Sequence, residues 1–267
     1  MSAREIKDAE ASAMKTHCLQ LNQQAQAAMD RKAWLEALGY LRQIAQDEPN
    51  SPEAHQRLGR ALMELGRNAE AQAAFRKALE LDRDYADALA GLGRTEFALG
   101  RPRSALRYLD SAIEIDPKPA EAHLARGESL AALGQTDDAL AAYFRALERD
   151  PSCTVATVRI AAIQRGRGQG SQALARLNQV LEIDSEHGEA RYQRGLVYLE
   201  REQMRAAVSD LDFAARKLPN RPDVYYHLAL ALQSAEEPEK ALDAVQHALR
   251  LAPHYAEAQQ LSDRLRR

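Results

Sequence analysis

The sequence has few of the residues that build disulfide scaffolds and membrane spans. Its 267 residues include two cysteines, Cys18 and Cys153, which are too few and too far apart to indicate a disulfide framework or a cysteine-based metal site. No apolar run approaches the roughly 18 residues of a membrane-spanning helix. The first residues carry five charges between Arg4 and Glu10 and lack the apolar core of a signal peptide. We therefore expect no membrane span and a cytoplasmic location.

Sequence signatures of catalysis and cofactor binding are also missing. The glycine-rich run GRGQG at 166–170 lacks the Gly-Lys-Ser/Thr ending of a phosphate-binding loop. The seven histidines include no pair spaced by four residues, and no Gly-x-Ser-x-Gly elbow occurs. A net charge of −3 argues against a generally basic nucleic-acid-binding protein. We expect no enzyme, no cofactor and no metal site.

Alanine dominates what is present. The chain contains 51 alanines against 13 glycines, 10 prolines and 14 aromatic residues. Alanine is the best helix former and a poor β-strand residue, so the composition predicts an all-α protein.

A 34-residue period organises the chain. The segments at 58–84, 92–118 and 126–152 resemble one another, and each lies 34 residues after the previous one. The same frame gives seven consecutive repeats without insertion or deletion, at 18–51, 52–85, 86–119, 120–153, 154–187, 188–221 and 222–255. Such a period is typical of repeat architectures.

Each repeat is predicted to contain two helices. An apolar-periodic segment runs to a glycine suited to a helix end, and a second segment follows, often reaching a proline. Position 20 of every repeat is alanine, and position 8 is glycine or alanine. Position 24 is larger, for example Phe75 and Tyr143. We expect the small residues to allow close approach of the two helices and the larger ones to fill the space between pairs.

This pattern resembles the tetratricopeptide repeat family over residues 18–255. The resemblance implies an all-α, right-handed superhelical solenoid of antiparallel helix pairs that binds partners in a concave groove. Residues 1–17 are expected to form an N-terminal helical extension, and 256–267 a C-terminal capping helix. Repeat 5 (154–187) fits the pattern least well, so a hinge is predicted there.

In this family the groove is lined by the first helix of each repeat, at positions 2, 5, 9, 12 and 13. The N-terminal half is then polar and locally basic, with Asn22, Gln26, Gln56, Arg60, Arg94 and Phe97, and Arg57 beside them. Repeat 4 supplies Leu124 and Glu128. The C-terminal half is apolar and aromatic, with Val155, Val158, Tyr192, Leu196, Leu199, Tyr226 and Leu230.

Two hypotheses about this groove have structural alternatives. Arg60 and Arg94 share a column in adjacent repeats, which suggests an anion site such as an acidic side chain or a C-terminal carboxylate. Alternatively, Glu64 or Glu128 neutralises them, or both extend into water. The apolar half favours a partner-binding patch. Its alternative is packing between successive first helices, or contact with a terminal segment.

These observations predict a non-enzymatic scaffold that binds a protein or peptide partner. A self-assembling protein that uses a terminus or convex face of a neighbouring chain is the alternative, and a homo-oligomer is possible. RNA binding is a distant third hypothesis, because no continuous basic stripe is present. The clamp by which some family members hold chaperone tails is not matched, since Asn22, Gln26 and Arg57 replace its Lys and Asn residues.

Overall fold

Helices occupy the same positions in every repeat. The computed structural model describes residues 18–266, and this part of the chain contains no β-strand. In repeat 1, residues 18–30 are helical and are followed by α2 (Trp34–Asp47). The other first helices are α3 (Pro52–Glu64), α5 (Ala86–Ala98), α7 (Ala120–Ala132), α9 (Thr154–Gly166), α11 (Gly188–Glu200) and α13 (Pro222–Ser234). The other second helices are α4 (Asn68–Leu81), α6 (Pro102–Ile115), α8 (Thr136–Arg149), α10 (Gly170–Ile183), α12 (Met204–Lys217) and α14 (Pro238–Leu251).

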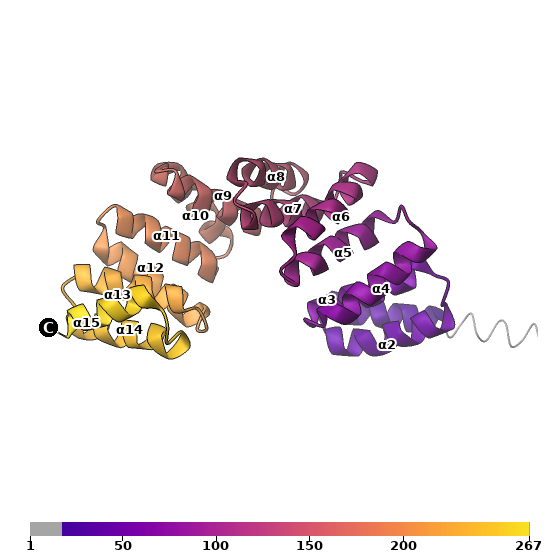
Figure 1. Cartoon of the computed structure of the whole chain (residues 1–267), viewed down its shortest axis with the longest axis horizontal. Coiled ribbons are helices and arrows are strands. Elements are labelled where there is room, and N and C mark those ends of the chain that lie inside the picture. The colour runs from indigo at the N-terminus through magenta and orange to yellow at the C-terminus, as the bar shows by residue number, and fades with distance from the viewer. Residues whose placement is uncertain (1–17, 267) are drawn as a thin grey trace, which may run out of the picture. The chain divides into compact units, whose positions relative to one another are not determined.

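Each first helix packs antiparallel against the second helix of its own repeat (Figure 1). The predicted all-α repeat fold is confirmed, and so is the 34-residue frame of its helices.

Position 15 of every repeat ends the first helix in a left-handed backbone conformation. Four of these residues are glycines: Gly66 (φ 71°), Gly100 (φ 76°), Gly134 (φ 75°) and Gly168 (φ 73°). The other three have side chains: Lys32 (φ 56°), Glu202 (φ 57°) and Glu236 (φ 62°). Glycine adopts this conformation without steric cost, whereas other residues lose about 1–2 kcal/mol. Gly168 also accounts for the GRGQG run, which spans the turn between the two helices of repeat 5.

Glycine at position 8 lets the two helices of a pair come close. A Cβ atom on Gly59 would lie 2.8 Å from the Phe75 ring, and one on Gly127 would lie 2.5 Å from the Tyr143 ring. Side chains at position 8 and position 24 therefore compete for the same space. The predicted role of the small-residue column is confirmed for these pairs.

The core runs along positions 20 and 24. The alanine at position 20 is fully buried in every repeat. The position-24 side chains are at most 1 % exposed: Leu41, Phe75, Leu109, Tyr143, Leu177, Leu211 and Val245. Within each module these side chains share apolar clusters with residues of the following repeat, as Phe75 does with Leu92 and Leu211 with Leu228. Hydrophobic stabilisation within each module therefore comes from the stacking of neighbouring repeats.

The described chain divides into two compact units. The N-terminal module contains residues 18–149, which are repeats 1 to 3 and both helices of repeat 4, and the C-terminal module contains residues 150–266. The division lies just before repeat 5, the repeat that fits the sequence pattern least well. The predicted extension at 1–17 falls outside the described residues.

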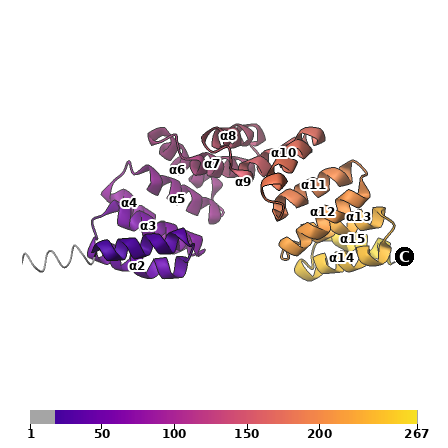
Figure 2. The same ribbon diagram turned by 180° about the vertical axis from the view of Figure 1, so that it is seen from behind.

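The C-terminal module ends in an additional helix, α15 (Ala256–Leu265), which packs against α14 (Figure 2). Leu261 of α15 is 1 % exposed, and Leu265 packs against the same apolar cluster. Helix α15 therefore covers the apolar side of the last repeat. No helix in the described part of the chain has the length and apolar character to cross a membrane.

Candidate functional site

Successive first helices contact one another through positions 5 and 6. In the N-terminal module, Arg57 at position 6 of repeat 2 donates from Nη1 to Asn22 Oδ1 at 2.5 Å. In the C-terminal module, Tyr192 at position 5 of repeat 6 lies 3.1 Å from His227 at position 6 of repeat 7, between Oη and Nδ1. We call the surface made by positions 2, 5, 6, 9, 12 and 13 of the first helices the first-helix face. It carries the residues that the sequence predicts to bind a partner.

A hollow of about 130 Å³ opens on the first-helix face of the N-terminal module. Ala90 and Gly91, at positions 5 and 6 of repeat 3, line it and leave space because they have almost no side chain. The ring of Phe75 fills the region behind Gly91, only 2.4 Å from where a Cβ atom would be. The hollow, which we call the Arg60 hollow, is lined by Gln56, Arg60, Met63, Phe75, Asp87, Ala90, Gly91, Arg94, Pro119, Glu121 and Ala122.

The two arginines of the Arg60 hollow are in different electrostatic states. Arg94 forms ion pairs with Glu64 at 3.6 Å and with Glu121 at 3.1 Å. Arg60 is exposed and forms no ion pair or hydrogen bond with any residue of the described chain. The sequence alternative that Glu64 neutralises an arginine therefore holds for Arg94. Arg60 remains available to an anion.

Carboxylates make this region less basic than the sequence suggests. Asp87 and Glu121 both line the Arg60 hollow. They occupy position 2 of repeats 3 and 4, in the first turn of their helices, where an acidic side chain also complements the helix dipole. Because Glu121 reaches back to Arg94 of the preceding repeat, the description of this half as locally basic is corrected to mixed charge, with Arg60 as its unpaired cation.

The predicted groove residues of repeat 1 have partners within their own helix. Asn22 Nδ2 donates to the Cys18 carbonyl oxygen at 3.0 Å. Gln26, which is exposed, donates to Asp30 Oδ1 at 2.8 Å. These weak, solvent-accessible bonds leave the amide of Gln26 open to exchange with a ligand.

Further along the same face, a second hollow of about 300 Å³ is lined by Phe97, Glu128 and Arg94, among other residues. Phe97, Leu124 and Glu128 are half-buried. The structure therefore brings Arg60, Arg94, Phe97 and Glu128 onto adjoining hollows of one face. Leu124 lies on the same first helix as Glu128.

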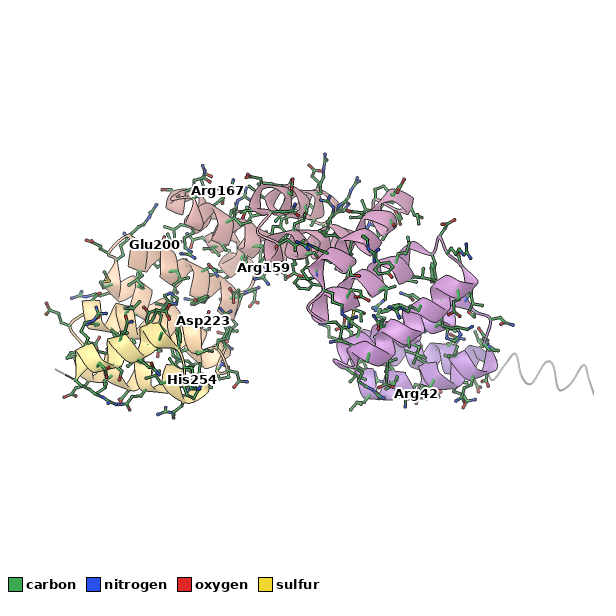
Figure 3. All side chains as sticks on the ribbon, viewed as in Figure 1. Arg42, Arg159, Arg167, Glu200, Asp223 and His254 are labelled. Carbon is green, nitrogen blue, oxygen red and sulfur yellow. The ribbon has the colours of Figure 1, made fainter. Side chains whose placement is uncertain are left out.

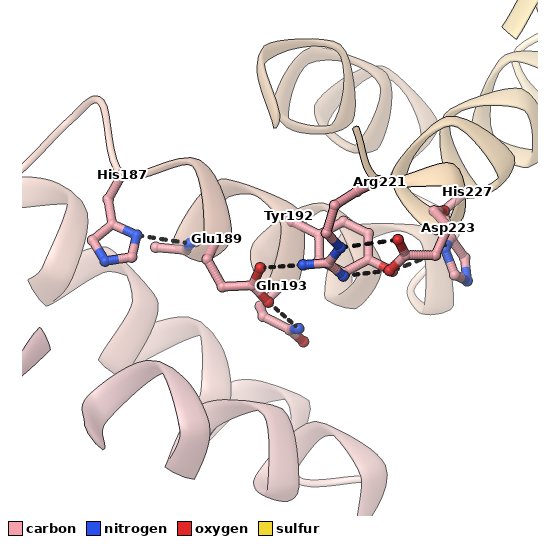
Figure 4. Close-up of polar contacts among 8 residues, drawn as sticks. His187, Glu189, Tyr192, Gln193, Arg221, Asp223 and His227 are labelled. Carbon is pink, nitrogen blue, oxygen red and sulfur yellow. Dashed lines mark hydrogen bonds and ion pairs between the residues drawn. The ribbon is translucent and has the colours of Figure 1, made fainter. Parts of the chain in front are cut away.

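In the C-terminal module a hydrogen-bonded network occupies the corresponding positions (Figure 4). Tyr192 Oη donates to Asp223 Oδ2 at 3.0 Å. Arg221 Nε donates to Asp223 Oδ1 at 2.9 Å, and Arg221 Nη1 donates to Glu189 Oε2 at 2.6 Å. Glu189 also accepts from Gln193 Nε2 at 2.9 Å. The Arg221 guanidinium lies 4.9 Å from the centre of the Tyr192 ring. This network ties α11 to α13.

Burial and charge set the protonation states in the network. Burial, together with the Asp223 carboxylate, raises the pKa of Tyr192, so its hydroxyl stays protonated and donates. Burial alone would raise the pKa of Asp223, but the Arg221 guanidinium and the Tyr192 hydroxyl hold it below its usual value. Burial lowers the pKa of His227, whose Nδ1 lies 2.7 Å from the Asp223 carbonyl oxygen. Because a carbonyl only accepts, the neutral His227 carries its proton on Nδ1.

The network explains why much of the predicted apolar patch is not exposed. Tyr192, Leu196 and Val158 are 4 %, 6 % and 2 % exposed. They pack between successive first helices, as the structural alternative in the sequence analysis predicts. Leu199, Tyr226 and Leu230 are half-buried and keep part of their surface. Val155, with 41 % exposure, is the most accessible of the predicted apolar groove residues.

Two buried polar atoms of the described chain lack hydrogen-bond partners, Gln193 Oε1 and Arg165 Nε, and both belong to the C-terminal module. Gln193 is at position 6 of repeat 6, so its register partner is Val158 at position 5 of repeat 5, which has no donor. Arg165 still forms an ion pair with Glu200, which is labelled together with Asp223 in Figure 3. A polar contact between position 5 of one repeat and position 6 of the next is therefore missing between Val158 and Gln193.

The residues predicted to line the groove do not include Arg221, His227, Glu189 or Asp223. The available signal was the combination of Tyr at position 5 with an acid at position 2 of the next repeat, which here places Tyr192 beside Asp223. This signal lies in the combination of different positions in successive repeats and is absent from any single position taken alone.

Comparison with known proteins agrees with the repeat geometry. Tetratricopeptide repeat profiles match residues 28–77, 62–129, 96–163 and 130–196, and a second profile of the same description matches 192–256. The chain belongs to the tetratricopeptide repeat family. The resemblance predicted from the sequence is therefore confirmed.

Solved structures share the fold at low sequence identity. The Cut9–Hcn1 assembly of the APC/C matches with a TM-score of 0.76 and 14 % identity over 92 % of this chain. This tetratricopeptide repeat chain spans 55 % of that matched chain. PilF of Pseudomonas aeruginosa matches with a TM-score of 0.69 and 18 % identity, over 80 % of this chain and 97 % of PilF.

YrrB, described as a TPR protein with an unusual peptide-binding site, matches with a TM-score of 0.53 and 21 % identity. This match covers 72 % of this chain and 99 % of YrrB. No protein with curated function matches the sequence. The matches establish the fold and a repeat architecture consistent with protein–protein interaction.

Proposed function

We propose that this tetratricopeptide repeat protein is a non-enzymatic scaffold that binds an extended peptide segment of a partner on the first-helix face of its N-terminal module. The observation that carries the proposal is the exposed, unpaired guanidinium of Arg60 beside a hollow with small residues at its base. Arginine binds carboxylates in bidentate geometry, so an acidic side chain or a C-terminal carboxylate of the peptide is its ligand.

Neighbouring groups would then position the rest of the peptide. Gln56 lines the same hollow and offers both an amide donor and an acceptor to the peptide backbone. Arg94 is held in place by Glu64 and Glu121, so it directs the ligand carboxylate to Arg60 rather than competing for it. Phe97 in the adjoining hollow supplies an apolar contact for the next side chain of the peptide.

The C-terminal module has a different part in this proposal. Its half-buried Leu199, Tyr226 and Leu230 form a shallow apolar surface beside the Tyr192 network. Such a surface accepts an apolar side chain without offering a charged anchor. We therefore assign the electrostatic selectivity of the protein to Arg60 and the N-terminal module.

A peptide selection tests the role of Arg60. A displayed library of random peptides is selected on the wild-type protein, and the best peptide is measured by fluorescence anisotropy. We expect Arg60→Ala to weaken binding at least about tenfold, the size expected for loss of a hydrogen-bonded charged group. Arg83→Ala removes the same charge from an exposed position of the N-terminal module outside the Arg60 hollow, and should change binding less than about twofold.

The peptide provides the complementary variants. Replacing each of its carboxylates in turn by the amide should identify one position where the loss is large with wild-type protein and absent with Arg60→Ala. Selected peptides without a carboxylate, or equal binding by wild type and Arg60→Ala with unchanged circular dichroism, would remove the assignment of Arg60.

A further inference from the structure

Repeats 3 and 7 carry opposite charges on the same local backbone. Residues 100–107 read GRPRSALR and residues 236–243 read EEPEKALD, four whole repeats apart. Both begin a 14-residue second helix with proline at its first position. The preceding residues, Arg101 (φ −117°, ψ 64°) and Glu237 (φ −112°, ψ 64°), have almost the same conformation. The two segments therefore present equivalent positions in equivalent geometry.

The charge inversion is complete at three equivalent positions. We define the α6 face by Arg101, Arg103 and Arg107, and the α14 face by Glu237, Glu239 and Asp243. The other five repeats show no such triad at these positions: Ala33/Leu35/Gly39, Arg67/Ala69/Ala73, Gln135/Asp137/Ala141, Gln169/Ser171/Ala175 and Gln203/Arg205/Ser209. The opposite charges thus belong to these two repeats and not to the pattern that all seven repeats of this chain share.

Three of these six charges have no partner in the described chain, and the Arg107 guanidinium contacts only Ser104 and the Tyr108 ring. Arg103, Glu239 and Asp243 are exposed and form no ion pair or hydrogen bond within the described residues. Arg101 reaches Glu96 only at 3.6 Å, and Glu237 pairs with the neighbouring Lys240. Exposed charges without partners keep their full attraction for an opposite surface at low salt.

Each face also borders a surface hollow. Arg101, Arg103 and Arg107 line a hollow of about 590 Å³ whose remaining lining is Pro102, Ser104 and Leu133. Glu237 and Asp243 line a hollow of about 630 Å³ that also contains Val208, Tyr225 and Leu232. Apolar surface beside the charges allows a docked partner to exclude water as well as to match charge.

The α6 face is electrostatically unfavourable in an isolated chain. A helix N-terminus carries partial positive charge and is stabilised by acidic residues. Helices α3, α4, α5, α7 and α8 each have an acidic residue in the first turn, whereas α6 has none and has Arg103 there. Helix α14 has Glu239 in its first turn. An anionic partner on the α6 face relieves a repulsion that this helix otherwise retains.

We propose that the α6 face of one copy of this chain docks on the α14 face of a second copy. The proposal commits to a second copy because the chain itself carries the oppositely charged face, at the same repeat positions. Two different surfaces meet in such a contact, so it is head-to-tail and extends into chains or closes into rings. It is independent of the peptide-binding proposal, which concerns the first-helix face.

Charge reversal on each face tests the contact. Sedimentation velocity is run on the full chain over a range up to about 200 µM and at about 50 and 500 mM NaCl, where screening differs strongly. We expect concentration-dependent association of the wild type at low salt and its loss at high salt. The variants R103E/R107E and E239R/D243R should each weaken association at least about tenfold, because like charges then face each other. The control R83E/K118E makes the same charge change at exposed positions outside the α6 face and should associate as wild type does.

Restoring the complementarity distinguishes a specific contact from a general charge effect. The chain with all four reversals, R103E/R107E/E239R/D243R, should associate again, and so should an equimolar mixture of the two single-face variants. A wild-type chain that stays monomeric at low salt overturns the proposal. Association that survives either reversal, or a fourfold variant that remains monomeric while its circular dichroism is unchanged, overturns it too.

Discussion

The two modules share one repeat frame, yet their first-helix faces differ. In the N-terminal module, Ala90 and Gly91 at positions 5 and 6 leave a hollow beside an unpaired Arg60. In the C-terminal module, Tyr192 and His227 at the same two positions meet across the repeats and bury a polar network. The same backbone therefore leaves a hollow at this face in one module and is filled by its own side chains in the other.

The difference shows that position 5 of one repeat and positions 2 and 6 of the next act together. Where position 5 is tyrosine, as in Tyr192, the acid at position 2 of the next repeat accepts its hydroxyl hydrogen. Where position 5 is alanine, as in Ala90, the acid Glu121 at position 2 pairs with Arg94 instead. The side chain at position 5 thus determines whether two successive first helices are joined by buried hydrogen bonds or leave a hollow between them.

The largest expected effect on stability comes from removing the buried Tyr192 side chain from the C-terminal module. Tyr192→Ala should lower the free energy of unfolding by about 3–5 kcal/mol, because it removes a buried ring and leaves Asp223 without its hydroxyl donor. Tyr226→Ala, at the same position of the next repeat but half-buried, should cost less. Native-state hydrogen exchange of α11 and α13 amides measures the loss within the C-terminal module. Equal losses for the two variants would contradict the distinction between a filled core position and a surface position.

The second prediction concerns the glycine behind the open face. Gly91→Ala should destabilise the N-terminal module by about 1–3 kcal/mol, because the new methyl group would overlap the Phe75 ring. Gly39→Ala is the matched control, since Gly39 also lies in a helix but has no atom within 4 Å of the added Cβ. It should stabilise by about 0.5–1 kcal/mol through helix propensity. Urea denaturation followed by circular dichroism gives the sign of each change, and the same sign for both would refute the packing argument.

The fold could be predicted almost completely because its determinants repeat. Small residues recur at position 8 and larger ones at position 24. The 34-residue period alone therefore predicts that Gly59 packs against Phe75, as it does in the structure. Seven copies of one pattern also fix the helix boundaries, since a shift in one repeat would misplace all the others.

The site could be predicted only in part. The family pattern predicts the face on which a residue lies, and in the structure Arg60 lines the hollow on the first-helix face. It does not predict which side chain of the next repeat a residue will contact. The ion pair between Arg94 and Glu121 and the hydrogen bond between Tyr192 and Asp223 therefore do not follow from it. Those outcomes depend on side-chain geometry across two repeats, which differs wherever the residue types differ.

A third, smaller effect distinguishes the turns of repeats 6 and 7 from those of repeats 2 to 5. Repeats 2 to 5 have glycine at the left-handed position 15, whereas Glu202 and Glu236 hold it in repeats 6 and 7. Replacing either glutamate by glycine should stabilise the C-terminal module by about 1 kcal/mol through relief of backbone strain. Glu182→Gly, at an exposed helical position of α10, should destabilise by about the same amount. Thermal unfolding of the three variants checks the opposite signs, and a loss at position 15 would show that the carboxylates have a stabilising contact there.

The smallest effect is a pH dependence confined to the filled face. Burial lowers the pKa of His227, so the unfolded chain binds a proton there more readily than the folded chain does. Stability therefore falls as the pH is lowered from about 6.5, the ordinary histidine value, towards the folded pKa. The depressed pKa of Asp223 acts later, because its contribution is present above about 3.9 and is lost only as the pH falls through the folded value. His227→Gln should remove the first loss and leave the second. Urea midpoints of wild type and His227→Gln, measured between about pH 7.5 and 5, should diverge on acidification; parallel curves would contradict a lowered pKa of His227 in the folded chain.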